Sequence, residues 1–233
     1  MQDYIFNILQ GSVMTLEVAL GSLLVAVVLG LLGAVAKLSP NRLLSFVATG
    51  YSTVIRGIPD LVLMLLIFYG GQIGLNHVLE AFGYEEYVEI NPFVAGVLTI
   101  GFIYGAYMTE TFRGAIIAIP KGQMEAGYAF GMSKPRVFFR ITVPQMIRFA
   151  LPGFTNNWLV LIKATALVSI LGLPDMTMLA KQAASAARSL TPMAPMLFFL
   201  FTGGIYLVFT TISLVALKQL DRKFSMGVRR GEF

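Results

Sequence analysis

Five long apolar segments constrain this chain more than any other feature. They lie at about residues 13–36, 58–81, 93–119, 151–173 and 194–217. About 20 apolar residues in a helix cross a hydrocarbon layer of roughly 30 Å, whereas apolar helices in soluble cores are shorter. The composition agrees, because 57% of the 233 residues are hydrophobic and only 12% are charged. We therefore predict an all-α, polytopic membrane protein with five transmembrane helices and one transmembrane domain, residues 1–233.

Glycines recur inside these apolar segments. In membranes, helices approach one another closely where small side chains line the contact, so the pattern predicts a tight helix bundle. The glycines concerned are Gly21, Gly30, Gly33, Gly70, Gly71, Gly96, Gly101 and Gly105.

The connections between the segments differ in charge. Lysines and arginines are concentrated after the first and third segments and in the tail, whereas the connection between the second and third segments has four glutamates and no basic residue. Because cytoplasmic loops retain basic residues, we predict an outer N-terminus and an inner C-terminus. The loop at residues 120–150 is then cytoplasmic and the segment at residues 174–193 lies outside. Anionic headgroups account for the net charge of +5, so no nucleic-acid partner is expected.

Several classes of chemistry find no support in the sequence. The chain has no cysteine and one histidine, His77, and no spacing typical of metal ligands, so neither a metal site nor thiol catalysis is predicted. No phosphate-binding G-x-x-x-x-G-K-[ST] loop and no Ser-His-Asp arrangement occurs. The N-terminus lacks the pattern of a cleaved signal peptide. We expect no catalytic residue, and energy for any active process must come from another subunit.

The cytoplasmic loop predicts a helical hairpin. Good helix formers precede Gly131, which suits a left-handed C-cap, and Ser133 and Pro135 suit the start of a second helix. Two interpretations of the hairpin remain open on physical grounds. It lies on the headgroups as an amphipathic anchor, or its acidic, small-residue first helix inserts into a groove of another protein.

A motif in this loop favours docking. Glu125-Ala126-Gly127 is followed by Gly131, by Ile141 sixteen residues after the glutamate and by Pro144 after nineteen. This register resembles the EAA motif of ABC importer permeases, with Gly127 in place of an alanine and Val143 in place of a leucine. The resemblance implies that the first helix couples the permease to a cytoplasmic ATPase. Glycine in a helix costs about 1 kcal/mol relative to alanine, so we expect a more easily deformed coupling helix.

The resemblance extends over nearly the whole chain. Three stretches, "STVIRGIPDLVLMLLIFYG", "YMTETFRGAIIAIPKGQMEAG" and "PGFTNNWLVLIKATALVSILGL", are similar to the polar amino-acid branch, and in particular to the Q-type permease subunits of histidine/lysine/arginine/ornithine importers. It implies the type I importer (MetI-like) fold in a bacterial inner membrane. Implied partners are two ABC ATPases that bind ATP and Mg, a periplasmic binding protein and a second permease, preferably in a heterodimer, with a homodimer as the alternative.

Charged and amide side chains inside apolar segments need an explanation, because burying them in a membrane is costly. Glu110 and Arg113 are three residues apart on one helix, and we predict a scaffolding ion pair beside the coupling loop, with Ile141 and Pro144 as further scaffold. Glu17 snorkels or faces the cavity. For the aromatic residues Tyr104, Tyr107 and Trp158, packing or interfacial roles are expected. Candidates for a substrate pathway are Asp60, Asn156, Asn157 and Lys163.

Two functions follow as hypotheses. The first is the permease subunit of an ATP-driven importer for polar amino acids, with basic ones favoured by Asp60 and by the resemblance. Opines derived from basic amino acids would also fit. The second is a self-sufficient channel or ion-driven carrier, whose loop merely lies on the inner leaflet. The paired broken helices that mark inverted-repeat carriers are not evident in the two halves of the sequence.

Overall fold

The computed structural model describes residues 2–84, 86–189 and 192–225, and every regular element in them is a helix. Five helices or continuous helical runs are long and apolar enough to cross a membrane, at residues 2–37, 60–81, 92–117, 134–171 and 194–224. The predicted all-α class and the five predicted spans are therefore confirmed. The elements are α1 (Gln2–Lys37), α2 (Arg42–Gly57), α3 (Asp60–Ala81), α4 (Pro92–Ile117), α5 (Lys121–Ala129), α6 (Lys134–Val137), α7 (Val143–Ala164), α8 (Met176–Ala186) and α9 (Ala194–Ser225).

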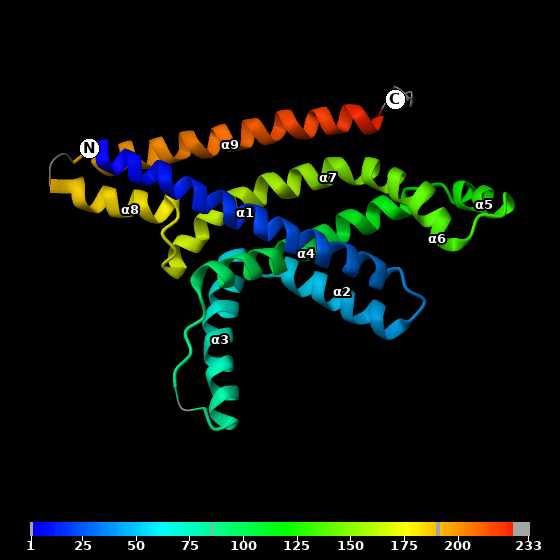
Figure 1. Cartoon of the computed structure of the whole chain (residues 1–233), viewed down its shortest axis with the longest axis horizontal. Coiled ribbons are helices and arrows are strands. Elements are labelled where there is room, and N and C mark those ends of the chain that lie inside the picture. Colours follow the sequence, from blue (N-terminus) through cyan, green and yellow to red (C-terminus); the bar gives the residue numbers. More distant parts are fainter. Residues whose placement is uncertain (1, 85, 190–191, 226–233) are drawn as a thin grey trace.

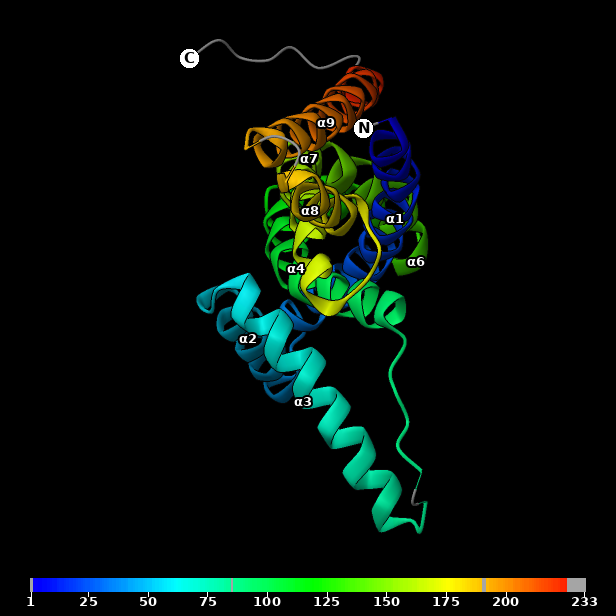
Figure 2. The ribbon, with the colours of Figure 1, turned by 90° about the vertical axis from the view of Figure 1, so that its left-hand side faces the viewer.

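The long helices α1, α4, α7 and α9 run roughly along the long axis of the molecule, and α3 projects away from them (Figures 1 and 2). The two ends of the described chain lie at opposite ends of the bundle. An odd number of crossings places the termini on opposite sides of a membrane, which agrees with this arrangement.

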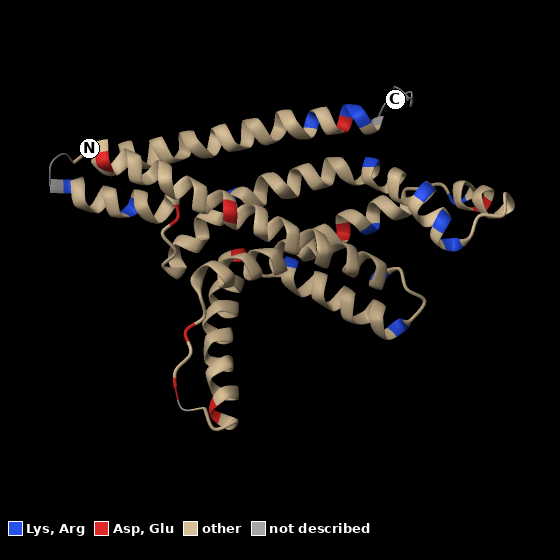
Figure 3. Ribbon diagram, in the orientation of Figure 1, with Lys and Arg blue, Asp and Glu red and all other residues tan. Residues whose placement is uncertain are grey.

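Many lysine and arginine residues lie at one end of the bundle, where α5, α6 and the last turns of α9 are found (Figure 3). We call this the basic end. The hairpin of α5 and α6 lies at this end, which is the end that the positive-inside rule predicts to be cytoplasmic.

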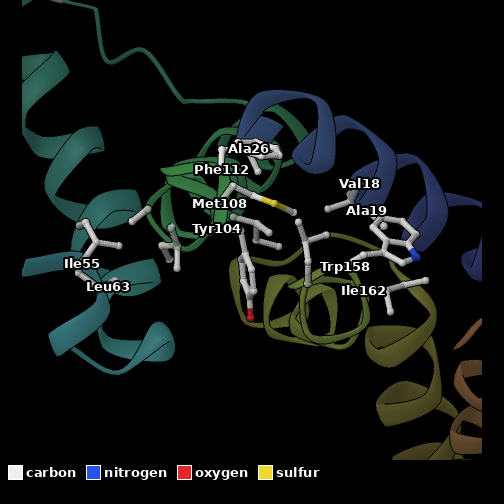
Figure 4. Close-up of a cluster of buried hydrophobic side chains, with 14 of the residues drawn as sticks. Val18, Ala19, Ala26, Ile55, Leu63, Tyr104, Met108, Phe112, Trp158 and Ile162 are labelled. Atoms are coloured by element: carbon white, nitrogen blue, oxygen red, sulfur yellow. The ribbon is translucent and has the colours of Figure 1, made fainter. Parts of the chain in front are cut away.

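Close contact between α1 and α4 forms the centre of the fold. At Gly101 an added Cβ would lie 2.5 Å from Cβ of Val25 and 3.2 Å from the carbonyl oxygen of Ser22, so only glycine allows this approach. Around it lies a cluster of buried side chains from α1, α4 and α7, including Val18, Met108 and Trp158 (Figure 4). The glycines of α1 and α4 that were predicted to allow close packing do so.

The glycines of α3 do not pack in this way. Nothing lies within 4 Å of the Cβ positions of Gly70, Gly71 and Gly74. In the most apolar 18-residue stretch of α3, only 17% of the residues are buried, whereas in that of α4 61% are buried. The prediction of close approach at Gly70 and Gly71 is therefore not met within this chain, because α3 leaves the bundle.

One helix was not predicted. The connection after α1 contains α2, which Asn41 caps by accepting hydrogen bonds from the N–H groups of Leu43 and Leu44 at 2.9 and 3.4 Å. Its buried residues are small or polar as well as apolar, Ala48, Ser52 and Ile55, and they share one face. This helix has no long run of large apolar residues, so hydropathy alone does not predict it.

Candidate functional site

The loop with the Glu125 motif folds as a hairpin of α5 and α6. Gly131 has a φ of +72°, the left-handed conformation predicted for it. Its N–H donates to the carbonyl of Tyr128 at 2.9 Å, and that of Met132 donates to the carbonyl of Gly127 at 3.0 Å. These two bonds form a Schellman motif, which satisfies the last carbonyls of α5. Ser133 stands at the predicted N-cap of α6, without a side-chain capping bond in the described part of the chain.

Gly127 is the residue on which the hairpin closes. It is the one buried residue of α5, and an added Cβ would lie 2.6 Å from Cδ1 of Ile141 and 3.0 Å from Cγ2 of Val137. Val137 is only 1% exposed. The absence of a side chain at Gly127 therefore allows α5 to pack closely against the second half of the hairpin.

The opposite face of α5 is open. Glu125 and Ala126 are exposed, and so are Tyr128 and Phe130, with Phe130 87% exposed at the C-cap. Large exposed aromatic side chains at the water-facing end of a membrane protein indicate a contact surface for another protein. The motif thus separates into Gly127 and Ile141, which pack within the hairpin, and Glu125 and Ala126, which do not. The aromatic pair was not identified in the sequence, where only the small residues of the helix were considered.

Between α6 and α7 the chain makes a π-helical turn, Phe138–Thr142, in which the N–H of Val143 donates to the carbonyl of Phe138. Pro144 follows at the start of α7 and has no N–H to donate to the carbonyl of Arg140. The wider π-helical turn accommodates the missing hydrogen bond at Pro144, so the helix continues from α6 into α7 without a loop.

Glu110 joins three helices near the basic end. Its carboxylate accepts from Arg113 Nε at 3.0 Å and from Ser52 Oγ at 3.1 Å, and it pairs with Lys37 Nζ, which also donates to Ser52 at 2.9 Å. The predicted pair of Glu110 and Arg113 is present. The contact between Lys37 and Glu110 was not predicted. The two residues are 73 positions apart, so no local pattern links them, and Lys37 served only as one of the basic residues that predict the orientation.

The four pathway candidates occupy two separate elements. Asp60 is the first residue of α3, where the helix dipole favours a carboxylate, and its Oδ2 accepts from Tyr104 OH of α4 at 3.0 Å. On α7, Asn157 donates to Thr111 Oγ1 of α4 at 2.9 Å and so ties the two helices together. Asn156 and Lys163 are exposed on α7, as Glu17 is on α1.

The segment that was predicted to lie outside contains a helix, α8, which packs against α1 and α9. Asp175 caps it and is buried; its two carboxylate oxygens accept from the N–H groups of Thr177 and Met178 at 3.1 and 2.9 Å. Burial raises the pKa of the Asp175 carboxyl, and these hydrogen bonds oppose the rise only in part. No group of side chains suited to a metal ion is found in residues 2–84, 86–189 and 192–225.

Comparison with known proteins places these features in a wider group. The family described as "binding-protein-dependent transport system inner membrane component" matches residues 26–226. HisQ of Escherichia coli K12, a histidine/lysine/arginine/ornithine transport system permease protein, is 53% identical over 97% of this chain and 96% of its own length. The octopine transport system permease protein OccQ of Rhizobium radiobacter is 36% identical over 97% and 93% of the two chains. The arginine ABC transporter permease protein ArtQ of E. coli K12 is 33% identical over 97% and 98%.

Solved structures give the same grouping. A chain from the crystal structure of an amino acid ABC transporter with histidines superposes with a TM-score of 0.77 at 31% identity, over 96% of both chains. A chain of the inward-facing MetNI methionine ABC transporter has a TM-score of 0.67 at 14% identity, over 94% and 95% of the two chains, and supports the fold alone.

Proposed function

Since the chain belongs to the family of binding-protein-dependent transport system inner membrane components, we propose that it is the permease subunit of an ATP-driven importer of basic amino acids, coupled to its ATPase through the α5–α6 hairpin. Permease subunits of this family contain no ATPase site of their own. A partner subunit then binds ATP and Mg and hydrolyses the nucleotide.

The exposed face of α5 is the observation on which the coupling role rests. A short helix that packs by a glycine on one side and presents Glu125, Ala126, Tyr128 and Phe130 on the other has the form of an element that fits a groove in a partner. From α5 the chain continues through α6 and the π-helical turn into α7, so force on α5 passes to a membrane helix. In the proposed cycle, ATP binding draws two ATPase subunits together and moves the hairpins with them, which shifts the complex toward an outward-open state.

Basic amino acids are the proposed substrates for two reasons. The relatives HisQ, ArtQ and OccQ belong to systems named for histidine, lysine, arginine and ornithine, for arginine, and for octopine. Asp60 also places a carboxylate inside the apolar region, where it can attract a cation. We assign Asn156, Asn157 and Lys163 to the same pathway as secondary candidates.

A second permease subunit is part of the proposal, with a heterodimer preferred. The apolar side chains of α3, including Leu66 at 66% and Ile73 at 59% exposed, and the uncovered Gly70 and Gly71, offer a face on which another membrane helix can pack closely. A periplasmic binding protein would deliver the substrate to the outer end, where α8 lies.

Reversal of one charge tests the coupling role. In Glu125→Arg, we expect normal membrane insertion but loss of the ATPase on co-purification and loss of uptake, because a cation replaces the exposed carboxylate of α5. Glu86→Arg, which makes the same change in the exposed connection after α3, serves as the control and should retain both. Normal co-purification and uptake in Glu125→Arg would refute the assignment of the hairpin.

Competition uptake by the whole complex tests the substrate. Arginine, lysine, histidine and ornithine should compete with one another, and glutamate and glutamine should not. A preference for glutamate or glutamine would end the proposal of basic substrates. ATP-independent flux through this chain alone in liposomes would instead favour the channel or carrier.

A further inference from the structure

A break in the helical backbone separates α2 from α3. Ile58 and Pro59 are extended, with ψ values of 139° and 135°, and the chain changes direction sharply between Gly57 and Asp60 (Figures 1 and 2). The break lies beside Tyr104 and Tyr107, at the middle of the 26-residue helix α4. It is therefore remote from both ends of the bundle, and broken helices at such depth are where transporters bind polar ligands.

Opposite charges flank this break, and two stacked tyrosines of α4 hold them. The Asp60 carboxylate accepts from Tyr104 OH at 3.0 Å, and Cζ of Arg56 lies 5.6 Å from the centroid of the Tyr107 ring. The two rings are stacked, with centroids 5.5 Å apart and an interplanar angle of 30°. Each charged side chain thus contacts a different tyrosine: Asp60 accepts a hydrogen bond from Tyr104, and Arg56 lies over the ring of Tyr107.

The two charges are not paired with each other. No ion pair joins Arg56 to Asp60, although charged pairs such as those of Lys37 and Arg113 with Glu110 form elsewhere in the described ranges. Arg56 is exposed and Asp60 is half-buried, so both have room for a further partner. A guanidinium suits a carboxylate, which it can bind through two parallel hydrogen bonds, and a carboxylate suits a guanidinium or an ammonium.

We propose that Arg56 and Asp60 form a zwitterion-binding pair, in which Arg56 binds the α-carboxylate of a basic amino acid and Asp60 binds the cation at the end of its side chain. The pair deepens the proposed function and rests on it for the substrate class. In an amino acid the α-ammonium is adjacent to the α-carboxylate, so protein charges that bound both would lie close enough to pair with each other. Arg56 and Asp60 do not pair, which fits a ligand whose two recognised charges are further apart.

Ligands that each lack one charge test the two roles separately. Agmatine is arginine without its carboxylate, and citrulline replaces the guanidinium with a neutral group. We would measure competition against radiolabelled arginine on the assembled complex in nanodiscs, without the binding protein. For the unaltered complex, both analogues should bind about tenfold or more weakly than arginine, because each leaves one protein charge without a partner.

The variants should each lose one form of discrimination. In Arg56→Gln, arginine binding should weaken about tenfold or more while agmatine binding changes less than about twofold. In Asp60→Asn, arginine should weaken similarly while citrulline stays within about twofold. Arg42→Gln, an exposed arginine at the other end of α2, is the control and should bind all three as before. Arg56→Lys keeps a positive charge and should retain most of the preference for arginine over agmatine.

Outcomes also separate this proposal from the one on which it rests. If Arg56→Gln weakens arginine and agmatine equally, or affects neither, Arg56 does not recognise the carboxylate and the pair is refuted. Assembly is followed by size-exclusion chromatography, and a variant that fails to assemble is replaced by Tyr107→Leu, which removes the support of Arg56 and should reduce the arginine-to-agmatine ratio. A complex that takes up no basic amino acid would instead refute the proposed function.

Discussion

At the scale of single residues, Gly127 stands where the EAA motif has an alanine, and the side chains packed around it explain this difference. The sequence predicts a weakened helix from the low propensity of glycine. The structure adds that the position faces Ile141 and Val137, with no room for a rigid side chain. Gly127 thus affects both the helix propensity of α5 and the packing of the hairpin, and substitutions can separate these two effects.

Gly127→Ala should change stability little. The new Cβ meets the end of the Ile141 side chain, which can turn away, and the gain in helix propensity of about 1 kcal/mol offsets the adjustment. Gly127→Val adds branches toward Val137 and should open the hairpin and reduce ATPase co-purification. Gly122→Ala is the matched control, because nothing lies within 4 Å of its Cβ position. Equal effects of alanine at 122 and valine at 127 on co-purification would show that packing at Gly127 is unimportant.

Lys37 and Glu110 should be strongly coupled. Their side chains are 12% and 20% exposed, so removal of one partner leaves a poorly solvated charge. In a double-mutant cycle with Lys37→Met and Glu110→Gln, thermal unfolding in detergent should give a coupling energy of about 1–3 kcal/mol. Arg113→Gln should couple less with Glu110→Gln, because that arginine side chain is 37% exposed. Additive effects of the Lys37 and Glu110 variants would mean that the pair is energetically neutral.

At the scale of elements, the helices that hydropathy marks were predictable and the others only in part. The segments that became α1, α3, α4, α7 and α9 carry long apolar runs, and the turn at Gly131 carries a local signal. The helix α2 lacked such a run, and the contact of Lys37 with Glu110 depends on α1 and α4 packing together. The sequence also marked Asp60, but the proximity of Arg56 and Tyr107 arises from the turn between α2 and α3. Long-range packing decides these features.

The N-terminus of α8 should confer a pH dependence on stability. The buried Asp175 carboxyl has a raised pKa in the folded chain, so the folded state binds a proton more tightly than the unfolded state. Stability from this group is greatest below the ordinary carboxyl pKa and falls as pH rises through the raised value. Asp175→Asn keeps a capping oxygen and should flatten this fall in thermal unfolding measured across pH. Asp175→Ala, which also loses the cap, should be about 1 kcal/mol less stable than Asp175→Asn at all pH values. An unchanged pH profile in Asp175→Asn would exclude the carboxyl as its source.

At the scale of the whole molecule, the position of the charges and the path of the chain support one orientation. Basic residues are concentrated at the end that contains the hairpin (Figure 3), whereas Glu80, Glu86 and Glu89 lie on the arm formed by α3 and the connection after it. Gln72 and Asn76 of α3 hold this connection by hydrogen bonds with the backbone of Val88 and Ile90. The acidic connection is thus fixed to α3 by hydrogen bonds.

The orientation can be measured directly, because the chain has no cysteine and single cysteines report without background. With a membrane-impermeant maleimide, we expect Glu86→Cys to be labelled in spheroplasts and Ser133→Cys only in inverted vesicles, because positive-inside retention places the α5–α6 hairpin within the cell. Both residues are exposed, so accessibility in the folded chain does not limit either reaction. Labelling after detergent solubilisation controls for expression and should be equal for the two variants. Reaction of Ser133→Cys in intact spheroplasts would reverse the orientation and place the hairpin where no cytoplasmic ATPase could reach it.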